Sequence, residues 1–206
     1  MLYACEFNLE GLQSGQMQQT VNLSGLALRW FESSSLHHSY AIHTPIGQLV
    51  AVCDANTLFY LQFTDSIHPS VFNTITFSND CPPVLETLRH ELDHYFLKKS
   101  TSFRVPLHID QGSDFYVHVW KNLISIPFGS TATYSDQAAA MNKPRAVRAI
   151  GTAIGKNPFV ILIPCHRVIR RDQTLGGYSA GLDRKKWLLQ HESSSTFDEK
   201  QAHDTQ

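Results

Sequence analysis

Short apolar segments separated by polar turn residues dominate the chain between residues 40 and 63. Tyr40–His43, Leu49–Cys53 and Leu58–Phe63 are rich in β-branched and aromatic side chains, which favour strands. Pro45-Ile46-Gly47 separates the first two segments and Asp54-Ala55-Asn56 the last two, and both are typical turn sequences. The pattern predicts a small antiparallel sheet.

A helical spacing follows, with apolar residues three or four positions apart. A proline pair at 82–83 opens one such segment, whose apolar residues are Leu85, Leu88, Leu92, Tyr95 and Phe96. Ser113 is a suitable N-cap for a second helix, and residues 126–129 end it. The apolar residues on one face of this helix are Phe115, Val119, Leu123 and Ile126. Similar patterns predict helices over about 134–141, 145–155 and 182–192.

The helices over 134–141 and 145–155 are short and joined by a tight turn at Asn142-Lys143-Pro144, which makes them a helix-turn-helix candidate. Opposite the packed side of the second helix, at i, i+3 and i+7, fall Arg145, Arg148 and Thr152. Small residues on the same helix would let its backbone approach DNA closely, namely Ala149, Gly151 and Gly155. The fold class is therefore α+β, with a small sheet domain followed by a helical domain.

The two ends of the chain lack such patterns. Residues 1–38 are rich in Gln, Ser and Gly, with a short apolar stretch at 26–31 that allows one strand. We expect a poorly ordered extension over 1–38, an α+β domain over 39–110, a second domain over 111–192 and a disordered tail over 193–206.

The charge of the chain is unevenly distributed. Over all 206 residues the formal net charge is −1, and a hydrophobic content of 42% with 17% charged residues is ordinary for a soluble globular protein. Residues 134–190, however, carry ten basic and three acidic side chains. This concentration is what a phosphate-facing surface requires, although charge alone fits a solvated face equally well.

The cysteines and the start of the chain bear on the compartment. The four cysteines, at 5, 53, 81 and 165, form no Cys-x-x-Cys pair and no zinc-ligand spacing, so we expect reduced thiols and no metal. The first basic residue is Arg29, which leaves no charged region of a signal peptide, and no apolar run is long enough to cross a membrane. We expect a cytoplasmic, intracellular protein.

Ile163-Pro164-Cys165-His166-Arg167-Val168-Ile169 is the most informative stretch. It ends an apolar run that starts at Phe159, and Pro164 fixes the backbone there. A buried structural cysteine is the ordinary interpretation of a lone cysteine. A thiol held rigidly beside a base and a cation is instead a candidate nucleophile.

This heptapeptide resembles the active-site signature of the O6-alkylguanine-DNA alkyltransferases, also called methylated-DNA–protein-cysteine methyltransferases. The resemblance covers about residues 112–192 in the family's order, and Thr44-Pro45-Ile46-Gly47 is similar to the family's first hairpin. The segments that carry it further are Gly112–Phe115, Val119–Leu123, Ile126–Gly129, Thr133–Ser135, Pro144–Ala149, Gly155–Pro158, Gly177–Ser179 and Trp187–Glu192.

The resemblance implies an RNase H-like first domain and a winged-helix-like second domain. It implies DNA repair by direct reversal, in which Cys165 takes an alkyl group irreversibly, once per molecule, from O6-alkylguanine or O4-alkylthymine. No cofactor is needed. The implied partner is double-stranded DNA, bound through the minor groove without sequence specificity by a monomer that associates with the nucleoid.

The resemblance also assigns roles to single residues. His166 acts as a base on Cys165 through a water and is oriented by Glu192, while Tyr134 donates a proton to the leaving guanine. Arg148 replaces the flipped base in the duplex, and the neighbouring DNA contacts are Arg145, Ala149 and Thr152. The base pocket is formed by Val168, Tyr178 and Ser179, and Asn157 stabilises the turn before the active-site strand.

Three other functions compete with alkyl transfer. Some relatives lack the cysteine and only recognise alkylated DNA, which the presence of Cys165 argues against. A helix-turn-helix transcription factor leaves Cys165, His166 and Tyr134 unexplained. A Cys–His hydrolase lacks the local signatures of such enzymes.

Overall fold

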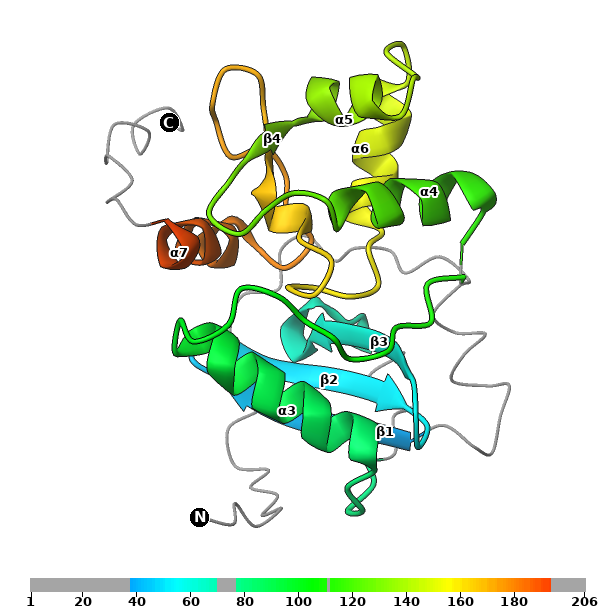
Figure 1. The fold of residues 1–206 in the computed structure, drawn as a ribbon, viewed down its shortest axis with the longest axis vertical. Coiled ribbons are helices and arrows are strands. Elements are labelled where there is room, and N and C mark those ends of the chain that lie inside the picture. Colours follow the sequence, from blue (N-terminus) through cyan, green and yellow to red (C-terminus); the bar gives the residue numbers. More distant parts are fainter. Residues whose placement is uncertain (1–37, 70–76, 111, 194–206) are drawn as a thin grey trace.

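The computed structural model describes residues 38–69, 77–110 and 112–193. The predicted extension, except His38, and the predicted tail, except Ser193, lie outside these residues, as does the apolar stretch at 26–31. The domain limits at 38, 110 and 192 stay predictions. Figure 1 shows the sheet and one helix in one half of the molecule, and the remaining helices in the other.

The predicted sheet is present as three antiparallel strands in the order β1-β2-β3. β1 spans His38–Thr44, β2 Gly47–Cys53 and β3 Leu58–Phe63. Thr44 pairs with Gly47 across the first turn, where Gly47 has a φ of +127° that other residues rarely adopt. All six residues of β3 are buried, because one face packs on the main core and the other on a smaller cluster formed by Val50, Val52, Tyr60 and Ile67.

Helix α3 covers the sheet and spans Pro83–Phe96, as the proline pair predicted (Figure 1). Its buried face consists of Val84, Leu85, Leu88, Leu92 and Tyr95. The short 3-10 helix η1, Thr64–Ser66, follows β3.

Helix α4 spans Asp114–Leu123 and begins at the predicted N-cap, since the Ser113 hydroxyl accepts a hydrogen bond from the Tyr116 N–H at 3.4 Å. It ends one turn earlier than predicted. Ser125 and Ile126 donate to carbonyls only three residues back, and Pro127 has no N–H to continue the helix. Ile126 is buried, but it lies beyond the helix.

The helix-turn-helix consists of α5, Tyr134–Ala140, and α6, Val147–Gly155. A capping box between Thr133 and Asp136 begins α5. The sequence placed Arg145 on the second helix, and this is wrong: the Ala146 N–H bonds to the Lys143 carbonyl in a turn, so α6 starts only at Val147.

The remaining elements surround the predicted nucleophile. β4, Ala132–Thr133, pairs in parallel with β5, Val168–Ile169, and the 3-10 helix η2, Cys165–Arg167, directly precedes β5. Helix α7 spans Leu182–Glu192, as predicted. The longest described helix has 14 residues, and no described helix combines the length and hydropathy that a membrane crossing requires.

Candidate active site

Cys165 lies at the start of a single helical turn rather than on a strand. The apolar run before it is buried but turns back on itself: Ile161 has a positive φ of 71°, and Ile163 donates to the Phe159 carbonyl. Leu61 of β3 accepts the Val160 N–H and so ties this loop to the sheet. The expected active-site strand is therefore a buried loop that delivers Cys165 into the core, where it is 3% exposed.

Asn157 holds both the loop and the sulfur. Its Nδ2 lies 3.0 Å from Cys165 Sγ and 2.8 Å from the Ile163 carbonyl, and its Oδ1 accepts the Phe159 N–H at 2.9 Å. The side chain is 2% exposed. The predicted turn-stabilising residue is thus in direct contact with the thiol.

His166 and Glu192, 26 residues apart, meet in the interior. His166 Nε2 lies 2.9 Å from Glu192 Oε1, and Arg167 donates to both carboxylate oxygens, from Nε at 2.8 Å and from Nη2 at 2.9 Å. Arg167 Nη1 also donates to the Ile126 carbonyl at 2.6 Å. A buried carboxylate with these partners fixes the imidazole ring.

The charges of this buried group are set by burial and by hydrogen bonds. Burial lowers the pKa of His166, and the Glu192 carboxylate opposes that shift. Burial alone would raise the pKa of Glu192, but hydrogen bonds from His166 and Arg167 hold it well below the ordinary value. The result is a neutral imidazole beside an ionised carboxylate. The other ring nitrogen, His166 Nδ1, is buried and has no hydrogen-bond partner among the described residues.

Lys185 is a site residue that the sequence interpretation missed. It was counted among the phosphate-facing charges, but it and Arg167 are buried. Lys185 Nζ donates to the Val168 carbonyl at 2.6 Å and to the Gly177 carbonyl at 3.2 Å. The spacing along α7 could have indicated that Lys185 is buried. Lys185 and Glu192 lie at positions i and i+7 of a stripe that also contains Leu188 and Leu189.

Lys185 and Cys165 influence each other's ionisation. Burial lowers the pKa of Lys185 to about 8, and the nearby Cys165 opposes that shift. Burial raises the pKa of the Cys165 thiol, whereas the Asn157 hydrogen bond and the Lys185 charge lower it. The site therefore combines a desolvated thiol with neighbouring polar and charged groups that favour the thiolate.

Tyr134, the first residue of α5, lies close enough to Cys165 to interact with its charge. It is half-buried, and a Cβ added to Gly176 would approach its hydroxyl to 3.1 Å. Burial raises the pKa of Tyr134, and the Cys165 charge acts in the same direction, so the phenol keeps its proton.

The predicted pocket residues gather around the same point. Val168 is buried on β5, and its carbonyl accepts from Lys185. The hydroxyls of Tyr178 and Ser179 are buried and have no hydrogen-bond partner among the described residues. The Tyr178 ring stands edge-on to His166 with 6.5 Å between the ring centroids.

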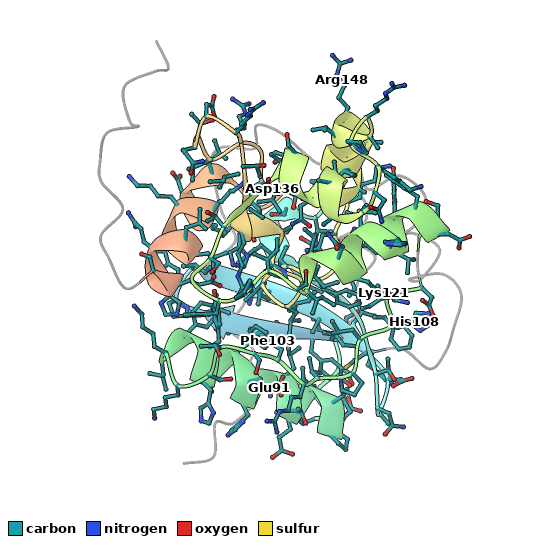
Figure 2. The ribbon with its side chains drawn as sticks, turned by 45° about the horizontal axis from the view of Figure 1, so that its top comes forward. Glu91, Phe103, His108, Lys121, Asp136 and Arg148 are labelled. Carbon is teal, nitrogen blue, oxygen red and sulfur yellow. The ribbon has the colours of Figure 1, made fainter. Side chains whose placement is uncertain are left out.

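The predicted DNA contacts lie on an outer face of the molecule. Arg148, Ala149 and Thr152 are exposed on α6, and Arg145 is exposed on the turn before it. Figure 2 shows Arg148 at the tip of α6, pointing away from the body of the protein.

Comparisons with known proteins match almost the whole described chain. Residues 36–109 match a family profile described as 6-O-methylguanine DNA methyltransferase, ribonuclease-like domain, and residues 114–194 match 6-O-methylguanine DNA methyltransferase, DNA binding domain. A methylated-DNA–protein-cysteine methyltransferase of Haemophilus influenzae is 33% identical over 166 residues, which cover 80% of this chain and 90% of the relative. This chain belongs to the methylated-DNA–protein-cysteine methyltransferase family.

Solved structures of the family agree. The crystal structure of the Mycobacterium tuberculosis O6-methylguanine methyltransferase matches with a TM-score of 0.69 and 35% identity, covering 79% of this chain and 97% of that chain. The same organism's protein in complex with DNA matches with a TM-score of 0.68 and 36% identity, covering 76% of this chain and 93% of that chain. The predicted family and the predicted α+β fold class are thereby confirmed.

Proposed function

We propose that this chain repairs DNA by direct reversal, as a methylated-DNA–protein-cysteine S-methyltransferase that moves a methyl or larger alkyl group from O6 of guanine to Cys165. The observation that carries the proposal is the buried arrangement of Cys165, His166 and Glu192 in a chain of this family, with Asn157 on the sulfur. O4-alkylthymine is a second substrate in the same chemical class.

The reaction begins with the thiolate. His166 takes the proton of Cys165 through a water, using Nδ1, while Glu192 holds Nε2. The sulfur attacks the alkyl carbon, the carbon–oxygen bond breaks, and its electron pair stays on the guanine. Tyr134 donates a proton to a ring nitrogen of the departing base and regains one, through solvent, from the imidazolium.

The product explains why the reaction occurs once. A thioether has no leaving group that water could displace to regenerate the thiol, so each chain accepts one alkyl group. None of these steps requires a metal or an organic cofactor.

The target atom lies inside the duplex, so the base must be flipped out at a cost of a few kcal/mol. Arg148 fills the gap in the stack, and Arg145, Ala149 and Thr152 approach the backbone and minor groove. Such contacts give little sequence specificity. We expect a monomer to perform this reaction on the cell's own DNA, in the nucleoid.

The flipped base needs polar partners in the pocket. The buried hydroxyls of Tyr178 and Ser179 are candidates, because they have no partner among the described residues. The Val168 carbonyl keeps one lone pair beside the Lys185 hydrogen bond, so it can still accept from the guanine amine.

Mass spectrometry after mixing the protein with duplex DNA that contains O6-methylguanine tests the proposal. We expect one added methyl group on the Cys165 peptide, saturating at one per chain. Cys165→Ala should bind the same duplex and gain no mass. A wild-type chain that binds the lesion without gaining mass would be a damage-recognition protein, and the proposal would be wrong.

A further inference from the structure

Glu192 has a hydrogen-bond donor from the other half of the molecule. The Tyr95 hydroxyl, on α3 beside the sheet, donates to Glu192 Oε1 at 2.7 Å. The same oxygen lies 2.9 Å from His166 Nε2 and 2.9 Å from Arg167 Nη2. Three donors therefore converge on the oxygen that holds the imidazole, and one of them belongs to neither η2 nor α7.

The Tyr95 side chain is buried and packs against neighbouring rings. Its ring has an edge contact with Phe128 at 5.9 Å and tilted contacts with Phe103 at 5.4 Å and His191 at 5.2 Å, measured between ring centroids. His191 Nε2 also lies 2.9 Å from the Tyr95 carbonyl. With 1% of the residue exposed, the hydroxyl has a fixed direction.

The hydroxyl remains a donor throughout the working pH range. Burial raises the pKa of Tyr95 far above its ordinary value, and the Glu192 charge adds to that shift. A neutral phenol that donates a hydrogen bond to a carboxylate withdraws part of the carboxylate's negative charge. Such charge-assisted hydrogen bonds are short and strong.

We propose that Tyr95 is a positioning residue for alkyl transfer, which orients Glu192 and limits the negative charge that this carboxylate presents to His166. The inference rests on the proposed function, because it assumes that His166 is the base. It gives the sheet-bearing half of the chain a part in setting the reaction rate.

Loss of the hydroxyl changes two properties of His166. Glu192 then presents more charge to the imidazole, so the imidazolium is favoured and the pKa of His166 rises. Because the base acts in its neutral form, the acidic limb of the pH–rate profile moves to higher pH. Glu192 is also less firmly held, so the maximal rate falls, by about tenfold for one hydrogen bond to a charged group.

Removing the Tyr95 hydroxyl leaves the other charged and titratable groups near His166 and Glu192 unchanged. Arg167 and Lys185 oppose protonation of His166, and the Glu192 charge also raises the pKa of Tyr178. Among the described residues, the hydrogen-bond partner of the Tyr95 hydroxyl is Glu192. A shift in the profile on removal of that hydroxyl therefore reports on the Tyr95–Glu192 contact.

The test measures single-turnover methyl transfer to Cys165 from O6-methylguanine duplex against pH, in the full chain, together with Tm. Tyr95→Phe should react about tenfold more slowly at its optimum and show the shifted acidic limb. Tyr40→Phe is the matched control, because it also removes a tyrosine hydroxyl from this half of the molecule, one that donates to Asp80 at 3.1 Å. It should leave rate and profile unchanged.

A Tyr95→Phe chain with the wild-type rate and profile overturns the inference, whatever its Tm. If this variant does not fold, 3-fluorotyrosine at position 95 replaces it: a more acidic phenol donates more strongly, so the acidic limb should move to lower pH, and an unmoved limb overturns the inference. A wild-type chain that transfers no methyl group refutes the proposed function itself, which separates the two failures.

Discussion

Burial opposes the ionised form of Cys165 on which alkyl transfer depends. The thiol is buried in the hydrophobic core, and the groups that favour the thiolate are the Asn157 side chain, the Lys185 charge and backbone hydrogen bonds at residues 165 and 166. Lys185 does so without contact with solvent, because its Nζ is held by the Val168 and Gly177 carbonyls. Lys185 is therefore the buried cation among the groups that favour the thiolate.

Lys185→Met removes that cation while keeping an unbranched side chain. The pKa of Cys165 should rise and the rate of methyl transfer near neutral pH should fall by about tenfold or more, since 1.4 kcal/mol of lost interaction is tenfold. Two carbonyls also lose their donor, which costs about 1–3 kcal/mol of stability. Single-turnover kinetics and urea unfolding measure both effects. Lys186→Met, at an exposed neighbouring position, should change neither.

Glu192 links the site to acid stability. Its pKa is depressed in the folded chain, so its contribution to stability is present above the ordinary value of 4.5 and is lost as the pH falls below that value. In Glu192→Gln, Tm should depend less steeply on pH below 4.5, and at pH 7 the unpaired Arg167 should cost about 3–5 kcal/mol. An unchanged slope in thermal melts at pH 3–5 would contradict this assignment.

The sequence pattern identified Cys165 and its neighbour His166 because an apolar run ends there in polar residues. It could not select Glu192, which lies 26 residues from His166 and has the composition of any helix end. The family resemblance supplied that pair. Tyr95 was predicted correctly as part of an apolar helix face, but a pattern of buried positions does not show where a hydroxyl points.

At the level of elements, periodic helices were predicted best. The apolar stripes of α3 and α7 set their limits, and a serine cap set the start of α4. The loop before Cys165 was not predicted, because a short run of Val, Ile and Leu favours a strand and only long-range contacts with β3 bend it. Arg145 was placed on α6 because its spacing from Arg148 and Thr152 is helical, although the helix begins only at Val147.

Arg148 is the basic residue of helix α6 and points outward, and base flipping is the step that should depend on it (Figure 2). Arg148→Ala should slow methyl transfer from duplex DNA by about 10- to 100-fold, because flipping costs a few kcal/mol. The rate with the free base O6-methylguanine should stay unchanged. Arg145→Ala should instead weaken DNA binding and reduce its salt dependence, with a normal rate once DNA is saturating.

At the level of the whole molecule, Arg184 connects the two halves. From α7 it donates to the Ile46 carbonyl at 2.8 Å and forms two hydrogen bonds with Asp65, at 2.8 and 2.7 Å, while its guanidinium lies 4.2 Å from the centroid of the Phe63 ring. It also donates to the Ala180 carbonyl at 3.0 Å, next to the predicted pocket residue Ser179. The sheet is thus linked, through Arg184, to the loop that carries the predicted pocket residues.

The parts of this contact should differ in strength. Asp65 is 64% exposed, so solvent screens its ion pair and Asp65→Ala should cost less than about 1 kcal/mol. Arg184→Ala also loses the carbonyl contacts and the Phe63 stacking, and should cost about 2–3 kcal/mol. Urea unfolding of the two variants and of the double variant measures the coupling. Equal losses would show that the ion pair dominates.

The position of Glu192 in the last turn of α7 has a consequence for synthesis on the ribosome. N-terminal parts of a chain generally fold first during translation. Until residue 192 has emerged, Arg167 has no counter-charge, and burying it alone would be strongly unfavourable. The helical half of the nascent chain should therefore stay open around Cys165 until the last turn of α7 has been synthesised. In a chain stalled before that turn, the Cys165 thiol would be exposed to solvent and to reaction with electrophiles.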